Sequence, residues 1–141
     1  MVVHFPLALT LASSVLLLAA RLLRRHDLAA TLAVVGTWNL CLGAAVAVIA
    51  LGTGLAAVLN LDVSAAARES ISTHAKWAIF TTLALVLLAV WRGAGTDSRS
   101  RPTWVFVIVL SAASAALIVT GYRGGQNVYR FGVGVETAVR P

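Results

Sequence analysis

Four apolar runs, each long enough to cross a lipid bilayer, constrain this chain more than any other feature. A membrane-spanning helix needs about 20 predominantly apolar residues. The runs lie near Phe5–Leu23, Leu28–Leu59, Ala75–Trp91 and Trp104–Tyr122. Charged residues make up only 11% of the chain, against about 25% in soluble domains. The sequence therefore predicts an all-α integral membrane protein, with residues 1–141 forming one four-span domain.

The short segments between these runs predict how the helices are arranged. Short loops make consecutive helices antiparallel neighbours, which favours an up-down-up-down four-helix transmembrane bundle. We expect residues 124–141 to form a short Gly-rich C-terminal tail. The second run is long enough to tilt or to project beyond the bilayer. Its polar Asn39 is expected to hydrogen-bond to another helix, and its glycines allow close helix approach: Gly36, Gly43, Gly52 and Gly54.

Arginine placement predicts the orientation. Three arginines follow the first run in "RLLRRHD" and none precedes it, so the positive-inside rule places this loop in the cytoplasm. The third loop, "WRGAGTDSRSRP", adds three more arginines to that side. An even number of spans then places both termini outside the bacterial plasma membrane. Lipid headgroups account for the net charge of +6, which excludes a nucleic-acid-binding role.

Two of the three histidines stand at matching places. His4 precedes Arg21 by 17 residues, and His74 precedes Trp91 by 17 residues. Both runs point the same way, so both imidazoles are predicted at one depth near the outer face, on diagonal partners of the bundle. Two facing imidazoles suit the axial ligation of one b-type haem, and His4 and His74 are the predicted iron ligands.

The residues beside each histidine favour the same site. The face of His4 carries small or aliphatic residues that admit a flat macrocycle: Ala8, Leu11, Ala12 and Val15. The face of His74 carries Trp77, Ala78, Thr81 and Thr82. Pro6 suits the first turn of a helix, and Ser72 is the expected N-cap of the third span.

Other interpretations of these residues remain open. Either histidine alone is an ordinary interfacial residue. Two imidazoles are too few for a closed zinc site, and no carboxylate lies inside a span for acid–base catalysis. No charged residue lies deep in a span, as a transporter would require. His26 is interpreted as a solvated loop residue, and Cys41 as a packing residue.

Three motifs carry a resemblance to a known family. "VHFP", "HAKWA" and "GGQNVYRFGVGVE" resemble a bacterial four-span membrane family known as domain of unknown function 2231. The resemblance covers nearly the whole chain and implies a membrane component associated with redox proteins. Members often carry histidine where this chain has Phe131, so here the tail supplies no such ligand.

The tail has a physical interpretation of its own. Its glycines allow the backbone to lie close over the mouth of the bundle. Arg123 and Arg130 are candidate partners for haem propionates, or else contact headgroups. Tyr129 is expected at the membrane interface.

These observations favour a cytochrome b-like electron-transfer protein rather than a stand-alone enzyme. It would bind one haem b between His4 and His74, with Trp77, Arg123 and Arg130 near the cofactor. It would exchange electrons between quinone and a redox partner protein on the outer face or in a larger respiratory complex, and an oligomer is possible. The alternative is a non-catalytic membrane anchor subunit of a redox complex, without haem of its own.

Overall fold

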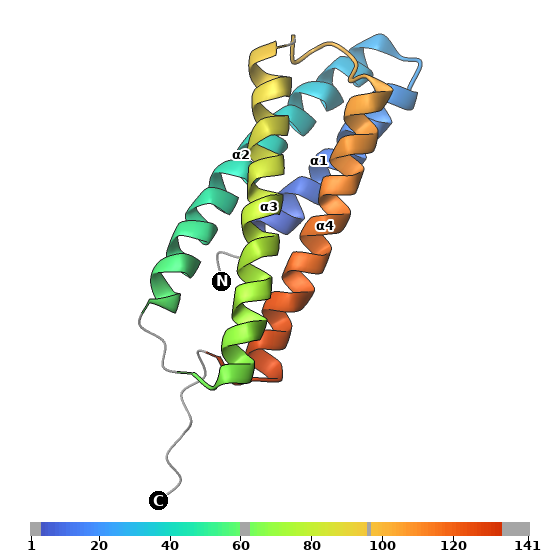
Figure 1. Cartoon of the computed structure of the whole chain (residues 1–141). Coiled ribbons are helices and arrows are strands. Elements are labelled where there is room, and N and C mark those ends of the chain that lie inside the picture. Colours follow the sequence, from blue (N-terminus) through green and yellow to red (C-terminus); the bar gives the residue numbers. More distant parts are fainter. Residues whose placement is uncertain (1–3, 60–62, 96, 134–141) are drawn as a thin grey trace, which may run out of the picture.

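The computed structural model describes residues 4–59, 63–95 and 97–133, which form four helices joined by short connections (Figure 1). The helices are α1 (His4–Leu22), α2 (His26–Val58), α3 (Ala65–Gly95) and α4 (Trp104–Tyr129). Each is long and apolar enough to cross a membrane. The predicted all-α four-helix bundle is confirmed.

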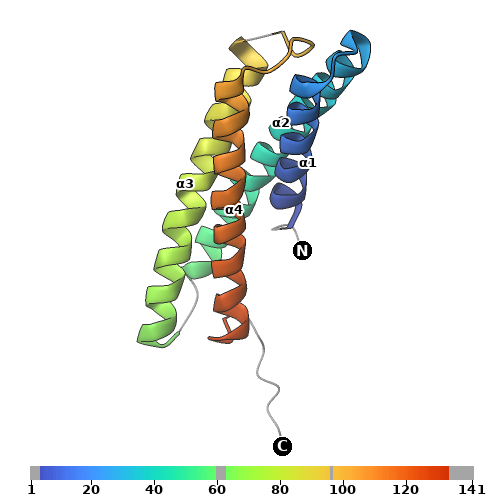
Figure 2. The same cartoon turned by 90° about the vertical axis from the view of Figure 1, so that its right-hand side faces the viewer.

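The helices form a ring in chain order. α1 packs against α2 and α4, and α3 packs against the same two, whereas within the described residues α1 does not contact α3. α1 and α3 are therefore diagonal partners, as the short loops indicate. We call the end where α1 and α3 finish the loop end, and the opposite end the tail end. α1 does not reach the tail end, because it begins part-way along α3 (Figures 1 and 2).

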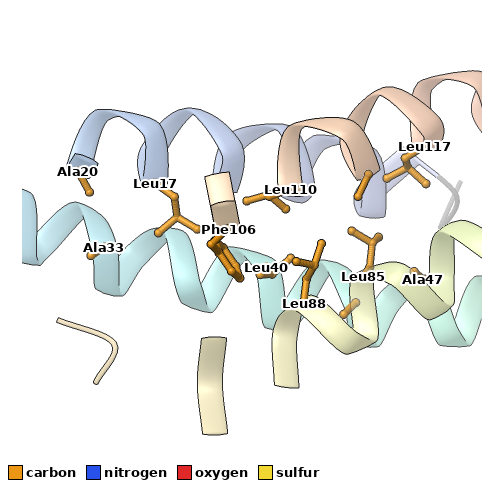
Figure 3. Close-up of a cluster of buried hydrophobic side chains, with 12 residues drawn as sticks. Leu17, Ala20, Ala33, Leu40, Ala47, Leu85, Leu88, Phe106, Leu110 and Leu117 are labelled. Carbon is orange, nitrogen blue, oxygen red and sulfur yellow. The ribbon is translucent and has the colours of Figure 1, made fainter. Parts of the chain in front are cut away.

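One apolar cluster fills the bundle, with all four helices contributing (Figure 3). Leu17, Leu40, Leu85 and Leu110 are each at most 1% exposed. Phe106 packs edge-to-face against Trp91, with ring centroids 5.3 Å apart. Because lipid tails are as apolar as leucine, shape and hydrogen bonds must supply the remaining preference of helix for helix.

Small residues provide that preference between α1 and α2. A methyl group added at Gly36 would lie 2.8 Å from Leu17 Cγ, so only glycine permits this approach. The Ser13 hydroxyl donates to the Gly36 carbonyl at 2.8 Å. Gly43 allows a similar approach to Thr10. The expected close contact fails at Gly52 and Gly54, which have no neighbour within 4 Å of an added methyl group.

The start of α3 differs from the sequence prediction. The helix begins at Ala65, so Ser72 lies inside it and is not its N-cap. Ser64 takes that role, because its hydroxyl accepts from the Ala67 N–H at 3.3 Å. Hydropathy locates only the lipid-exposed part of a helix, and the polar first turns of α3 extend past it.

The expected tail also begins later than predicted. Gly124 and Gly125 belong to α4, which continues to Tyr129. The helix closes at Gly132, whose φ of 64° is the left-handed conformation common after a helix. The Gly132 N–H donates to the Val128 carbonyl at 3.0 Å. Residues 134–141 of the expected tail lie outside the described residues.

Three other residues differ from expectation. The Asn39 amide donates to the Val35 carbonyl of its own helix at 2.9 Å and not to a neighbouring helix. His26 is exposed as predicted, but it is the first residue of α2 and not part of the loop. Arg92, interpreted as part of the third loop, lies in the last turn of α3 and is only 3% exposed.

Candidate functional site: the α3–α4 polar seam

His74 lies on the inward-facing side of α3. The buried residues of this helix follow helical spacing at Ala67, Ile71, Thr81, Leu85 and Leu88, and position 74 falls within the same series. The imidazole is half-buried. His74 thus lies on the inner side of the bundle, and its neighbours Thr81 and Thr82 are buried.

A backbone carbonyl of α4 orients the imidazole of His74. Nδ1 lies 3.1 Å from the Thr120 carbonyl oxygen, and because a carbonyl only accepts, Nδ1 must carry the proton. In the neutral ring this leaves a lone pair on Nε2. Within the described residues Nε2 has no hydrogen-bond partner, and it is not among the fully buried polar atoms. It is therefore at least partly exposed.

Gly124 makes room for the ring. A methyl group added there would lie 3.0 Å from His74 Cε1 and 3.6 Å from both ring nitrogens. Thr120 and Gly124 are one helical turn apart, so α4 supplies both the acceptor and the space. Gly124 of the tail motif thus acts inside a helix, where a larger residue would press on the imidazole, whereas a methyl group at Gly125 would meet only Tyr129, at 4.0 Å.

Further polar contacts surround His74 along the α3–α4 interface. The Ser70 hydroxyl donates to Asn127 Oδ1 at 2.6 Å. On the other side of His74, the hydroxyls of Thr81 and Thr120 lie 3.4 Å apart. We call this set the α3–α4 polar seam, which comprises Ser70, His74, Trp77 and Thr81 of α3 and Thr120, Arg123, Gly124 and Asn127 of α4.

Trp77 and Arg123 contact each other at the edge of the seam. The Arg123 guanidinium carbon lies 5.8 Å from the centroid of the Trp77 ring, within range of a cation–π contact. Its Nε atom is fully buried and has no hydrogen-bond partner among the described residues. The structure thus brings together three of the predicted site residues, His74, Trp77 and Arg123.

His4 is not brought to the seam. The buried stripe of α1 runs through Pro6, Thr10, Ser13, Leu17 and Ala20, and His4 lies roughly 160° around the helix from Pro6. The imidazole is exposed, as are the four neighbours predicted to line the macrocycle. Since α1 does not contact α3 within the described residues, this arrangement does not pair His4 with His74.

Two further predicted residues lie outside the seam. Arg130 follows the last turn of α4, where its guanidinium lies 5.9 Å from the Phe131 ring centroid. Tyr129 is 93% exposed, which agrees with an interfacial position.

A second polar cluster, at the loop end, was missed by the sequence analysis. Arg92 Nε donates to the Thr37 hydroxyl of α2 at 3.2 Å. Its Nη2 donates to the Ser98 carbonyl at 3.1 Å, and Nη1 donates to the Ser100 hydroxyl at 3.3 Å. These bonds hold the α3–α4 loop against the bundle. The one sequence feature that could have indicated this cluster is an arginine placed directly after an apolar run.

The described residues also limit which metals the protein could hold unaided. They contain no group of three or more His, Cys, Asp or Glu side chains placed to hold a metal ion. A metal at His74 would therefore need most of its ligands from a cofactor, as a porphyrin supplies four nitrogens to iron.

The chain was compared with known proteins. A family model described as "Predicted membrane protein (DUF2231)" matches residues 1–137. No curated protein and no solved structure matches the chain. The family match and the four apolar helices establish a multi-pass membrane protein in contact with lipid.

Proposed function

We propose that this chain, which belongs to the DUF2231 family of predicted membrane proteins, is an electron-transfer protein that binds one b-type haem at the α3–α4 polar seam. The observation that carries the proposal is the state of His74. Its Nδ1 is engaged by a backbone carbonyl, while Nε2 is partly exposed and has no hydrogen-bond partner among the described residues. Metal-ligating histidines almost always donate their other ring N–H in this way, which fixes the tautomer and orients the ring.

The seam residues fit the cofactor through one protein ligand, His74. Their part is to hold the His74 imidazole, through Thr120 and Gly124, and to present the Arg123 cation beside Trp77, where it would meet a propionate. When bound, the haem would supply a one-electron carrier for exchange between the quinone pool and a partner protein.

The second axial position is a separate part of the proposal. His4 remains the predicted ligand, and it can approach α3 only if the first turn of α1 rotates toward the bundle axis. Without that movement, His74 would be the only protein ligand. The two outcomes have different spectra, so the experiment can distinguish them.

The test is a reduced-minus-oxidised visible spectrum of detergent-purified protein expressed with excess haem. We expect a b-type spectrum in the wild type and its loss in His74→Ala. His26→Ala, at the loop end, is the matched control and should keep the wild-type spectrum. In His4→Ala, a change from low-spin to high-spin iron would assign His4 as the second ligand. An unchanged low-spin spectrum would reject it.

A wild-type protein without haem under these conditions would overturn the proposal. It would leave a non-catalytic membrane anchor subunit of a redox complex. One observation favours this second candidate: the seam already closes α3 against α4 through protein contacts alone, from Ser70–Asn127 to Thr81–Thr120. In that case His74→Ala would lower bundle stability and change nothing else.

The proposal includes an orientation in the bacterial plasma membrane, with the tail end outside. It rests on the three arginines of the first loop. Cysteines replace exposed Tyr129 at the tail end and exposed Arg99 at the loop end, in a Cys41→Ala background. An impermeant thiol reagent should label only the former in intact spheroplasts. Labelling of only the latter would reverse the orientation.

A further inference from the structure

An unpaired arginine lies on a tryptophan where α1 meets α4 at the loop end. The Arg21 guanidinium carbon lies 5.3 Å from the centroid of the Trp104 ring. Its Nε is fully buried and has no hydrogen-bond partner among the described residues. The aromatic contact is the only interaction that the described residues give this side chain. A guanidinium has five N–H donors, so this cation is positioned but not neutralised.

The surroundings add positive charge. The segments that form the loop end contain six arginines and two aspartates: Arg21, Arg24, Arg25, Arg92, Arg99 and Arg101, with Asp27 and Asp97. Arg101 Nη2 donates to the Arg24 carbonyl at 3.3 Å, which ties the α3–α4 loop to the first loop beside Arg21. The Asp97 carboxylate accepts from the backbone N–H of Arg99 at 3.0 Å, so it is already engaged within its own loop.

The depth of Arg21 in the membrane follows from a second pair of the same kind. Trp104 and Arg123 are 19 residues apart on α4, roughly 28 Å along the helix. Each belongs to an Arg–Trp contact, one at either end of the bundle. This spacing matches the hydrocarbon thickness of about 30 Å, and tryptophan and arginine both favour its borders. Arg21 therefore lies at the level of the lipid phosphates.

Apolar side chains continue from this corner toward the membrane centre. On α4, Val105 and Ile108 are 61% and 64% exposed. On α1, Leu18, three residues before Arg21, is 38% exposed. A ligand with a phosphate at Arg21 can thus lay acyl chains along the same two helices. A free anion would gain nothing from these surfaces.

We infer that the Arg21–Trp104 corner binds the phosphate of an anionic phospholipid, with its acyl chains against the exposed apolar faces of α1 and α4. Arg21 supplies charge-assisted hydrogen bonds to the phosphate, and Trp104 holds the guanidinium flat. The proposal is independent of haem binding, because it lies at the opposite end of the bundle from His74.

The experiment measures thermal unfolding of the full chain in nanodiscs of neutral phosphatidylcholine, with and without 10 mol% cardiolipin. We expect cardiolipin to raise the unfolding midpoint of the wild type by several degrees, and Arg21→Gln to lose most of that shift. Arg99→Gln removes the same charge from the same end and should keep the shift. Trp104→Leu keeps the charge without the aromatic support and should lose part of it.

Three results would overturn the inference. Equal losses in Arg21→Gln and Arg99→Gln would show a diffuse charge effect without a site. An equal rise with inorganic phosphate in neutral nanodiscs would show a free-anion site. No rise in the wild type would show no site at all. If Arg21→Gln fails to fold, native mass spectrometry of the wild type and Arg99→Gln still decides, because each should retain bound cardiolipin in preference to phosphatidylcholine.

Discussion

The approach of α1 to α2 at Gly36 gives a sharp test of the packing on which the bundle depends. In Gly36→Ala the new methyl carbon would lie 2.8 Å from Leu17 Cγ, 3.0 Å from Leu17 Cδ2 and 3.2 Å from Leu16 Cβ. Favourable carbon–carbon contacts begin at about 3.5 Å. Leu17 is fully buried and cannot move aside, so the two helices must separate by several tenths of an ångström.

The cost can be isolated with a matched variant of the same helix. Overpacking a core costs about 1–3 kcal/mol, whereas glycine to alanine in a helix gains about 1 kcal/mol. Gly52→Ala makes the same chemical change where nothing lies within 4 Å, so it should gain helix stability without any overpacking. The difference in unfolding free energy between the two variants is therefore the overpacking term, about 1–3 kcal/mol in favour of Gly52→Ala.

The assay is reversible unfolding in mixed detergent micelles, followed by helical circular dichroism. Gly36→Ala should unfold at lower denaturing-detergent concentration than Gly52→Ala. Equal midpoints would refute the reasoning, because they would mean that α1 and α2 are not held at the distance that the structure shows.

Three more predictions use the same assay. Ser14→Ala removes the 2.8 Å contact between the hydroxyls of Ser14 in α1 and Ser114 in α4, and it should lower the free energy of unfolding by about 0.6 kcal/mol. Ser111→Ala should lower it by less, because the Ser111 hydroxyl bonds within its own helix. Arg92→Met removes the donors to the Ser98 and Ser100 carbonyls of the α3–α4 loop and should lower the free energy of unfolding by about 1–3 kcal/mol, while Arg99→Met should leave it nearly unchanged. If both arginine variants behave alike, Arg92 does not anchor the loop. In Gly124→Ala the new methyl group would press on the His74 ring, so this variant should be about 1 kcal/mol less stable to unfolding than Gly121→Ala, whose methyl group meets nothing within 4 Å. Equal stability of the two variants would mean that the His74 ring does not lie against Gly124.

Helix number and connectivity could be predicted because span length and loop length fix them directly. The ends of α3 and α4 could not. The first turns of α3 contain Arg68 and Glu69, and charge in a segment just outside the bilayer resembles a loop on a hydropathy scale. Gly124 and Gly125 suggested a turn, but in membrane helices glycine commonly permits close packing, and Gly124 has that role beside His74.

The placement of His4 shows a deeper limit of the sequence. Depth along a helix follows from counting residues, but the direction of a side chain requires knowing which face is buried. In a soluble helix the apolar stripe reveals that face. In α1 both faces are apolar, with Leu17 inside and Leu11 and Val15 outside, because lipid is as apolar as the protein core. The small polar residues of α1 give the usable signal, because Thr10 and Ser13 lie on its buried face.

The same reasoning places the candidate site relative to the membrane. Trp77 and Arg123 mark the hydrocarbon border at the tail end, and His74 precedes Trp77 by three residues, roughly 4.5 Å toward that end. On the proposed placement its imidazole would lie at the membrane interface, between the bilayer and the aqueous side. A haem held there would present one edge to water-soluble partners and the other to quinone in the bilayer. α1 does not cover this end of α3 (Figure 2), and the contacts that position His74 come from α4. Electron exchange at such a site would then be sensitive to Gly124 and Arg123 but not to the packing of α1 against α2.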